Sequence, residues 1–140
     1  MTTVNSRRLS GALRACARGL YPLEAGTGLL IDCGSWLHRN DFTSRFITAG
    51  TGISDGATLL ASIDWEAAVT ALHAGKLPAS GGERRMLLLA ASIAAGTLVD
   101  LNDALPGIDR RNAGLAVRAV AHAAGLPDPH QETDIRYQNG

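Results

Sequence analysis

The segment from Ser80 to Gly96 constrains the fold more than any other part of the chain. Ser80 and Glu83 have the spacing of a capping box, in which a serine hydroxyl and a glutamate carboxylate each accept a hydrogen bond from a backbone amide at a helix start. Gly96 suits the end of the helix, because glycine readily takes the left-handed conformation found there. Between them, Met86–Ala95 is apolar on every face but for one serine. A helix that is apolar all round is buried, so we expect other helices to surround it.

The remaining periodicity predicts a mainly α-helical fold, a compact bundle of five or six helices around this central helix. Several of the helices have clear ends, such as the N-cap residues Asp64 and Asp109. The first two are less clearly divided, because Pro22 either kinks one long helix or opens a second. The expected helices run from Asn5 or Ser6 to Arg18, from Pro22 to about Leu37, from Asn40 or Asp41 through Ile47, from Asp64 to Gly75 and from Asp109 to Gly125.

Two short segments have the pattern of β-strands and predict one two-stranded β ribbon. Thr97–Leu101 alternates as a strand does, and Leu59–Ile63 is a short apolar run. We expect these two segments to pair with each other. Ala49–Thr58 is rich in glycine and has no periodicity, which predicts an exposed loop.

Length and charge limit the class of protein. With 140 residues, of which 46% are apolar, we expect one helical domain over residues 1–126 and a flexible tail over residues 127–140. The formal net charge is zero, so no overall field draws the chain to nucleic acid or to a membrane. The uncharged run of the central helix is shorter than the roughly 20 residues that span a bilayer. The first residues lack the apolar stretch of a secretory signal, so we expect a cytoplasmic protein without a membrane span.

Aromatic side chains are rare, at 4% of the chain, and three of them are grouped with two arginines. The group is Trp36, Arg39, Phe42, Arg45 and Phe46. Aromatic and arginine side chains are enriched at binding interfaces, so this segment is the candidate interaction surface. The same spacing also fits packing inside the core, and both interpretations stay open here.

The first expected helix, which ends at Arg18, is the one basic helix of the chain and contains no acidic residue. Its arginines are Arg7, Arg8, Arg14 and Arg18. Arginines along a helix can bind a phosphate backbone and release its counterions. This gives a nucleic-acid interface as an alternative, beside the simpler interpretation of a solvated outer face.

Two close acidic pairs provide the only candidates for general acid and base catalysis. They are Asp64 with Glu66 and Asp100 with Asp103. Such a pair acts in catalysis only where both carboxylates face one cleft. Each pair also fits a helix start or a turn, where acidic side chains serve as caps, and we therefore assign no catalytic residue.

Cysteine and histidine residues do not have the spacing of a metal site. Cys16 and Cys33 lie on apolar helix faces, and we expect two buried thiols without a disulfide. Cys33 and His38 are five residues apart, which on a helix places them on different faces and disfavours a nucleophile with its base. The histidines stand singly, at His38, His73, His122 and His130. We expect no metal and no cofactor.

One resemblance covers the chain from about Leu20 to Ala124. In sequence order, the segments that carry it are Trp36–Phe42, Ile63–Trp65, Ser80–Glu83, Val99–Leu101 and Asp103–Leu105. With these segments the chain resembles an uncharacterised family of small actinobacterial proteins. The resemblance implies an intact domain from a bacterium with a GC-rich genome, and it implies no activity and no site residue.

These features favour a non-enzymatic interaction or regulatory module that binds a protein partner, or a second copy of itself as a homodimer, through Trp36–Phe46. The first alternative is a nucleic-acid-binding protein that uses the four arginines of the N-terminal helix. The second is a small enzyme with Asp64, Glu66 or Asp100 in a cleft.

Overall fold

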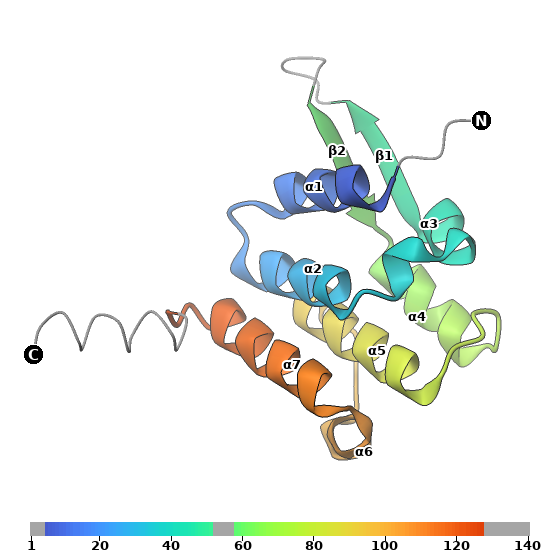
Figure 1. Ribbon diagram of the computed structural model, residues 1–140, viewed down its shortest axis with the longest axis vertical. Helices are drawn as coiled ribbons and strands as arrows, with labels where there is room; N and C mark the ends of the chain where they lie inside the picture. Colours follow the sequence, from blue (N-terminus) through green and yellow to red (C-terminus); the bar gives the residue numbers. More distant parts are fainter. Residues whose placement is uncertain (1–4, 52–57, 128–140) are drawn as a thin grey trace, which may run out of the picture.

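The computed structural model describes residues 5–51 and 58–127 of the chain. It is mainly α-helical with one two-stranded antiparallel sheet, which confirms the predicted fold class (Figure 1). The described helices are α1 (Ser6–Ala17), α2 (Tyr21–Cys33), α3 (Asn40–Phe46), α4 (Trp65–His73), α5 (Gly81–Ala95), α6 (Leu101–Ala104) and α7 (Arg110–Ala123). The other described elements are β1 (Ile47–Thr51), β2 (Leu59–Ile63) and the 3₁₀ turns Trp36–His38 and Leu105–Gly107. The predicted tail lies, after Pro127, outside the described residues.

The helix α5 is the central helix that the sequence predicts. The Ser80 hydroxyl accepts a hydrogen bond from the Glu83 amide at 3.2 Å, and the Glu83 carboxylate accepts one from the Ser80 amide at 3.0 Å. The capping box is therefore confirmed, as is the end at Gly96, where φ is +78°. Helices α2, α4 and α7 pack around α5 (Figure 1). Its buried part, Met86–Ala91, is shorter than predicted, because Ser92, Ile93 and Ala94 are only partly buried and Ala95 is exposed.

The backbones of α2 and α5 approach each other closely at Gly26. A Cβ atom at this position would lie 2.5 Å from the carbonyl oxygen of Ala90 and 2.7 Å from the amide nitrogen of Ala94. No side chain fits there unless the two helices move apart, because the obstructing atoms belong to the backbone. Gly26 therefore permits the close packing of α2 against α5.

The first two helices are separate rather than one kinked rod. Gly19 turns the chain at φ +96°, and α2 then starts with Pro22 in its first turn. The helix ends at Cys33, earlier than the apolar seam to Leu37 predicts. The reason is Gly34, which takes the left-handed conformation at φ +83° and donates its N–H to the Ile31 carbonyl at 3.2 Å.

The predicted partner of strand β2 is wrong. The strand Leu59–Ile63 exists, but it pairs with Ile47–Thr51, in a register that places Ile47 opposite Ile63. Thr97–Leu101 forms no strand, because Asp100 accepts hydrogen bonds from the amides of Asn102 and Asp103 and thereby caps α6. The prediction of an exposed loop is wrong for its first residues, which belong to β1; residues 52–57 lie outside the described residues.

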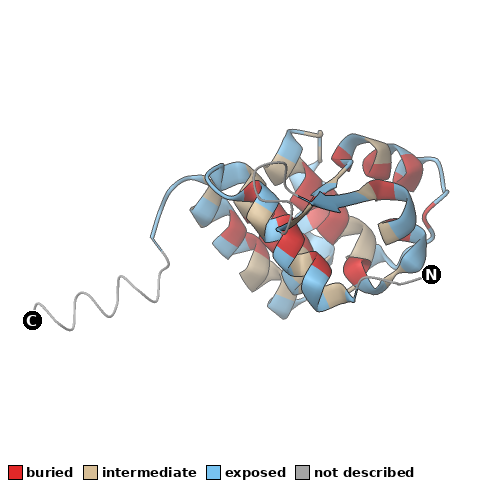
Figure 2. Cartoon of the chain, turned by 90° about the horizontal axis from the view of Figure 1, so that it is seen from above, coloured by how far each residue is buried: buried red, intermediate tan, exposed pale blue. Residues whose placement is uncertain are grey.

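A second apolar cluster joins α1 to the sheet. Helix α1 packs on β2, and the buried members of this cluster are Leu9, Ala12, Leu13, Leu37 and Ala61. Burial follows the helix faces that meet inside the molecule, while the outer faces are exposed (Figure 2). Helices α2 and α5 therefore lie at the centre of the fold, and α1 packs together with the sheet at one side of it.

We expect Gly26→Ala to lower the free energy of unfolding by about 2 kcal/mol, because overpacking of a tight contact outweighs the gain in helix propensity. The matched control is Gly11→Ala in α1, where no atom lies within 4 Å of the added Cβ. This variant should be as stable as the wild type or more stable, by up to about 1 kcal/mol. Urea unfolding followed by circular dichroism measures both changes. A Gly26→Ala protein as stable as the wild type would contradict the close packing.

Candidate functional site

The aromatic side chains of the predicted interaction surface lie in the core. Trp36 and Phe42 are 0% exposed and Phe46 is 7% exposed. Their rings pack in sequence, with centroids 5.2 Å apart for Trp36 and Phe42 and 5.7 Å apart for Phe42 and Phe46. In this conformation Trp36 and Phe42 offer no area to a partner and Phe46 offers very little, so the core-packing interpretation applies to them. Arg39 and Arg45 remain at the surface of this segment.

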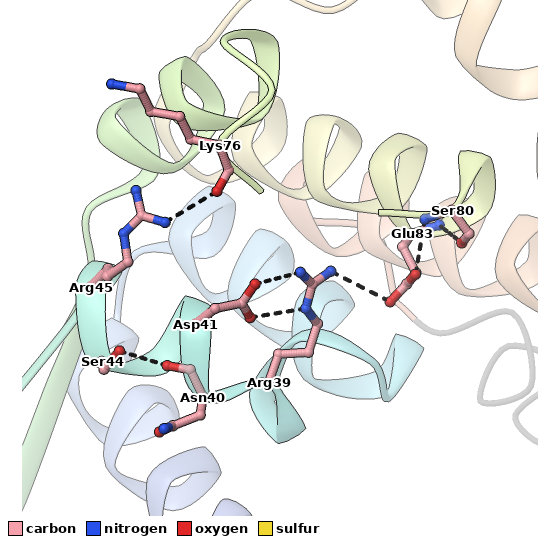
Figure 3. A network of polar contacts seen from close by, with 8 residues as sticks. All are labelled: Arg39, Asn40, Asp41, Ser44, Arg45, Lys76, Ser80 and Glu83. Carbon is pink, nitrogen blue, oxygen red and sulfur yellow. Dashed lines mark hydrogen bonds and ion pairs between the residues drawn. The ribbon is translucent and has the colours of Figure 1, made fainter. Parts of the chain in front are cut away.

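Arg39 joins α3 to the start of α5. Its guanidinium contacts the Asp41 carboxylate at 2.6 and 3.0 Å and lies 3.8 Å from that of Glu83 (Figure 3). It also stacks over the Trp36 ring, 4.5 Å from the centroid, and the Trp36 indole donates to the Glu83 carbonyl at 3.0 Å. The hydrogen bond with Asp41 raises the pKa of Arg39, and the same bond lowers the pKa of the Asp41 carboxyl. This arrangement stabilises the junction between the 3₁₀ turn, α3 and α5.

Arg45 lies at the edge of an open groove beside α4. Its guanidinium stacks over the Phe46 ring at 4.8 Å and donates to the Lys76 carbonyl at 3.2 Å (Figure 3). We call this feature the α4 groove, with a volume of about 490 Å³. It is lined by Arg45, Phe46, Asp64, Glu66, Ala67, Thr70, Ala71, Ala74 and Lys76.

The acidic pair Asp64 and Glu66 also lines the α4 groove, so the structure brings these two residues to one surface. Both are exposed, and Asp64 accepts a hydrogen bond from the Ala67 amide at 3.1 Å as the N-cap of α4. Asp100 lies elsewhere, as the cap of α6. The capping role predicted for Asp64 is therefore confirmed, whereas Asp100, predicted to flank a turn, caps a short helix; a catalytic role for either remains an untested alternative.

The four N-terminal arginines do not share one environment. Arg7 and Arg8 are exposed on α1, whereas Arg14 forms an ion pair with Asp32 of α2 at 3.1 Å. Arg14 and Arg18 both line a cleft between α1, α2 and α7, which we call the arginine cleft. Its volume is about 440 Å³, and its lining consists of Arg14, Arg18, Glu24, Ala25, Gly28, Leu29, Asp32, Leu115, Arg118, Ala119, Ala121, His122 and Leu126.

Sequence reasoning did not identify Glu24, Arg118 and His122 as neighbours in this cleft. Glu24 accepts a hydrogen bond from the Gly19 amide at 3.0 Å and pairs with His122 at 2.9 Å, and these contacts lower the pKa of the Glu24 carboxyl. The i, i+4 spacing of Arg118 and His122 indicates one face of α7. It cannot show that this face meets α2.

The two thiols differ, and the prediction that both are buried is wrong. Cys16 is exposed and Cys33 is partly buried; neither forms a disulfide. Cys33 donates its S–H to the Leu30 carbonyl at 3.1 Å, and burial raises the pKa of this thiol. Its protonated form is favoured, which disfavours a role as nucleophile.

Within residues 5–51 and 58–127, no group of three or more histidine, cysteine, aspartate or glutamate side chains is placed to hold a metal ion. None of the described helices is long and apolar enough to cross a membrane.

Comparisons with models of protein families, with curated proteins and with solved structures give no match. The functional argument therefore rests on the two surface features described above.

We expect Arg39→Ala to lower the free energy of unfolding by about 1–2 kcal/mol at pH 7, because it removes a stacked and doubly hydrogen-bonded guanidinium. The folded-state pKa of Asp41 is lowered, so the stabilisation is complete above its unfolded-state value, about 3.9, and is lost as the pH falls further. Urea unfolding should show that the difference in the free energy of unfolding between Arg39→Ala and the wild type is smaller at pH 3 than at pH 7. The control Arg7→Ala should stay within about 0.5 kcal/mol at both pH values. A pH-independent loss would assign the effect to packing alone.

Thiol labelling should distinguish the two cysteines. At pH 8 in native buffer, we expect the Cys33→Ser protein, which retains Cys16, to react with 5,5′-dithiobis-(2-nitrobenzoate) at least about tenfold faster than the Cys16→Ser protein. The reason is that Cys33 is less exposed and its thiol pKa is raised. In denaturant the two rates should become equal. Equal rates in native buffer would contradict the burial of Cys33.

Proposed function

We propose that the protein is a non-enzymatic interaction module that binds a segment of a protein partner in the α4 groove. The observation that carries this proposal is the distribution of charge in the groove. Asp64 and Glu66 lie at the start of α4, whereas Lys76 follows the end of this helix and its backbone carbonyl accepts a hydrogen bond from the Arg45 guanidinium of α3. A partner segment with a basic and an acidic group in the complementary order would be bound and aligned by the two ends.

The floor of the groove supports a polypeptide as the occupant. Ala67, Ala71 and Ala74 have the i, i+4, i+7 spacing of one helix face, which extends over about 10 Å at 1.5 Å per residue. Small side chains along this line let a helix or an extended segment approach α4 closely. The groove is open along its length, and such surfaces are typical of peptide recognition rather than of enclosed small-molecule sites.

This proposal retains part of the surface that the sequence predicts. Arg45 and the edge of Phe46 belong to the groove, while Trp36, Arg39 and Phe42 stabilise the fold behind it. The capping bond of Asp64 fixes the acidic end of the groove with the rest of α4. The role of the acidic pair in the proposal is to recognise positive charge.

Thr70→Arg tests the proposal, because it places a long cationic side chain over the middle of the groove at an exposed position of α4. The matched control is Thr48→Arg, at an exposed threonine on β1 outside the groove. We expect a protein from the organism of origin to be retained by the wild type and the control, and its affinity for purified Thr70→Arg to fall at least about tenfold in calorimetry.

Circular dichroism must first show that both variants are folded. A partner that binds the wild type and Thr70→Arg equally well would contradict the assignment of the groove. Loss of binding by the Thr48→Arg control would place the interface on the sheet instead.

A further inference from the structure

The arginine cleft shares no residue with the α4 groove and has a different chemical character. Helix α2 provides its floor, and side chains of α1 and α7 provide the two walls. Its volume, about 440 Å³, falls within the range of sites for small molecules, about 300–1,000 Å³. Figure 1 shows α1 and α7 on either side of α2, so the walls come from segments far apart in the sequence.

Positive charge exceeds negative charge in the cleft lining. Its two acidic residues are both paired, Asp32 with Arg14 at 3.1 Å and Glu24 with His122 at 2.9 Å. The other two arginines, Arg18 and Arg118, form no ion pair with any residue that the structure describes. With histidine counted as neutral, the lining holds three arginines and two carboxylates, and one bound monovalent anion would balance its net charge.

The floor of the cleft is apolar. Ala25 and Leu29 of α2 and Ala119 of α7 lie at its base and are nearly buried, and Leu115 of α7 is partly exposed. Gly28 also lies at the base of the cleft, where an added Cβ would meet only the Arg14 guanidinium, at 3.4 Å. A ligand that fits both features needs an anionic head and an apolar body.

We propose that the arginine cleft binds a small organic anion, with a carboxylate, sulfonate or phosphate group at Arg18 and Arg118 and an apolar body on Leu115 and Leu126, the two lining leucines that keep exposed surface. The guanidinium groups supply charge-assisted hydrogen bonds to the head, and the aliphatic side chains remove the body from water. The pairs Arg14–Asp32 and Glu24–His122 connect α2 to the two walls and hold the cleft open at its rim.

The two parts of the ligand can be separated with two fluorescent probes. The probe 8-anilinonaphthalene-1-sulfonate carries an anionic group, whereas N-phenyl-1-naphthylamine has nearly the same aromatic body without it. We expect the sulfonate to bind the wild type at least about tenfold more tightly than the neutral probe, since the difference is one charge-assisted contact. Equal affinities for the two probes would overturn the proposal.

Variants then locate the binding. Arg18→Gln and Arg118→Gln should each weaken sulfonate binding about tenfold, while Arg110→Gln, at an exposed arginine on α7 outside the cleft, should leave it unchanged. Ala121→Trp should block both probes by filling the cleft, whereas Val120→Trp, at its exposed neighbour, should block neither. Thermal unfolding verifies that each variant is folded. Binding that survives Ala121→Trp, or that ignores both glutamine variants, would overturn the proposal.

Discussion

The close approach of α2 and α5 at Gly26 determines the positions of the other helices. Because no Cβ separates the two backbones there, α2 lies deep against the central helix and is itself largely buried. Helices α1 and α7 then pack on α2 rather than on each other. The space left between them above α2 is the arginine cleft. The same contact that stabilises the core therefore sets the width of a surface feature on the other side of α2.

A second constraint acts at the N-terminus of α5. Glu83 caps this helix through Ser80, lies near the Arg39 guanidinium, and offers its backbone carbonyl to Trp36. One residue thus joins the helix start, the 3₁₀ turn and α3. This explains why arginine and aromatic residues are interleaved in a segment that is mostly buried. The cations cover the rings at the surface of the core, where stacking of a guanidinium on an aromatic face is favourable.

The sequence predicted most reliably those features that depend on neighbours in the chain. The capping box of Ser80 and Glu83, the caps at Asp64 and Asp109, and the glycine at Gly96 all need only residues within one turn of a helix. Strand pairing was wrong because it depends on contacts between distant segments. Asp100 began a short helix and removed Thr97–Leu101 from the available strands, so β2 paired with β1 instead.

The candidate sites also depend on contacts between distant segments, which the sequence pattern does not reveal. Burial of Trp36 could not be decided from spacing, since a buried aromatic cluster and an exposed one have the same pattern in a short segment. Glu24 and His122 are separated by 98 positions, and no local pattern indicates that they meet. The arginine cleft is assembled from three helices, so its charge balance exists only in the folded chain.

The two ion pairs at the rim of the cleft matter more for charge placement than for stability. The side chains of Arg14 and Asp32 are each 51% exposed, and pairs of this kind contribute about 0–1 kcal/mol. Their removal would change the stability little. What they determine is which cations are already neutralised. Because Asp32 pairs with Arg14 and Glu24 pairs with His122, Arg18 and Arg118 are the arginines of the lining that form no ion pair among the described residues. A weak surface interaction can thus define the electrostatics of a binding site even where it adds almost nothing to the fold.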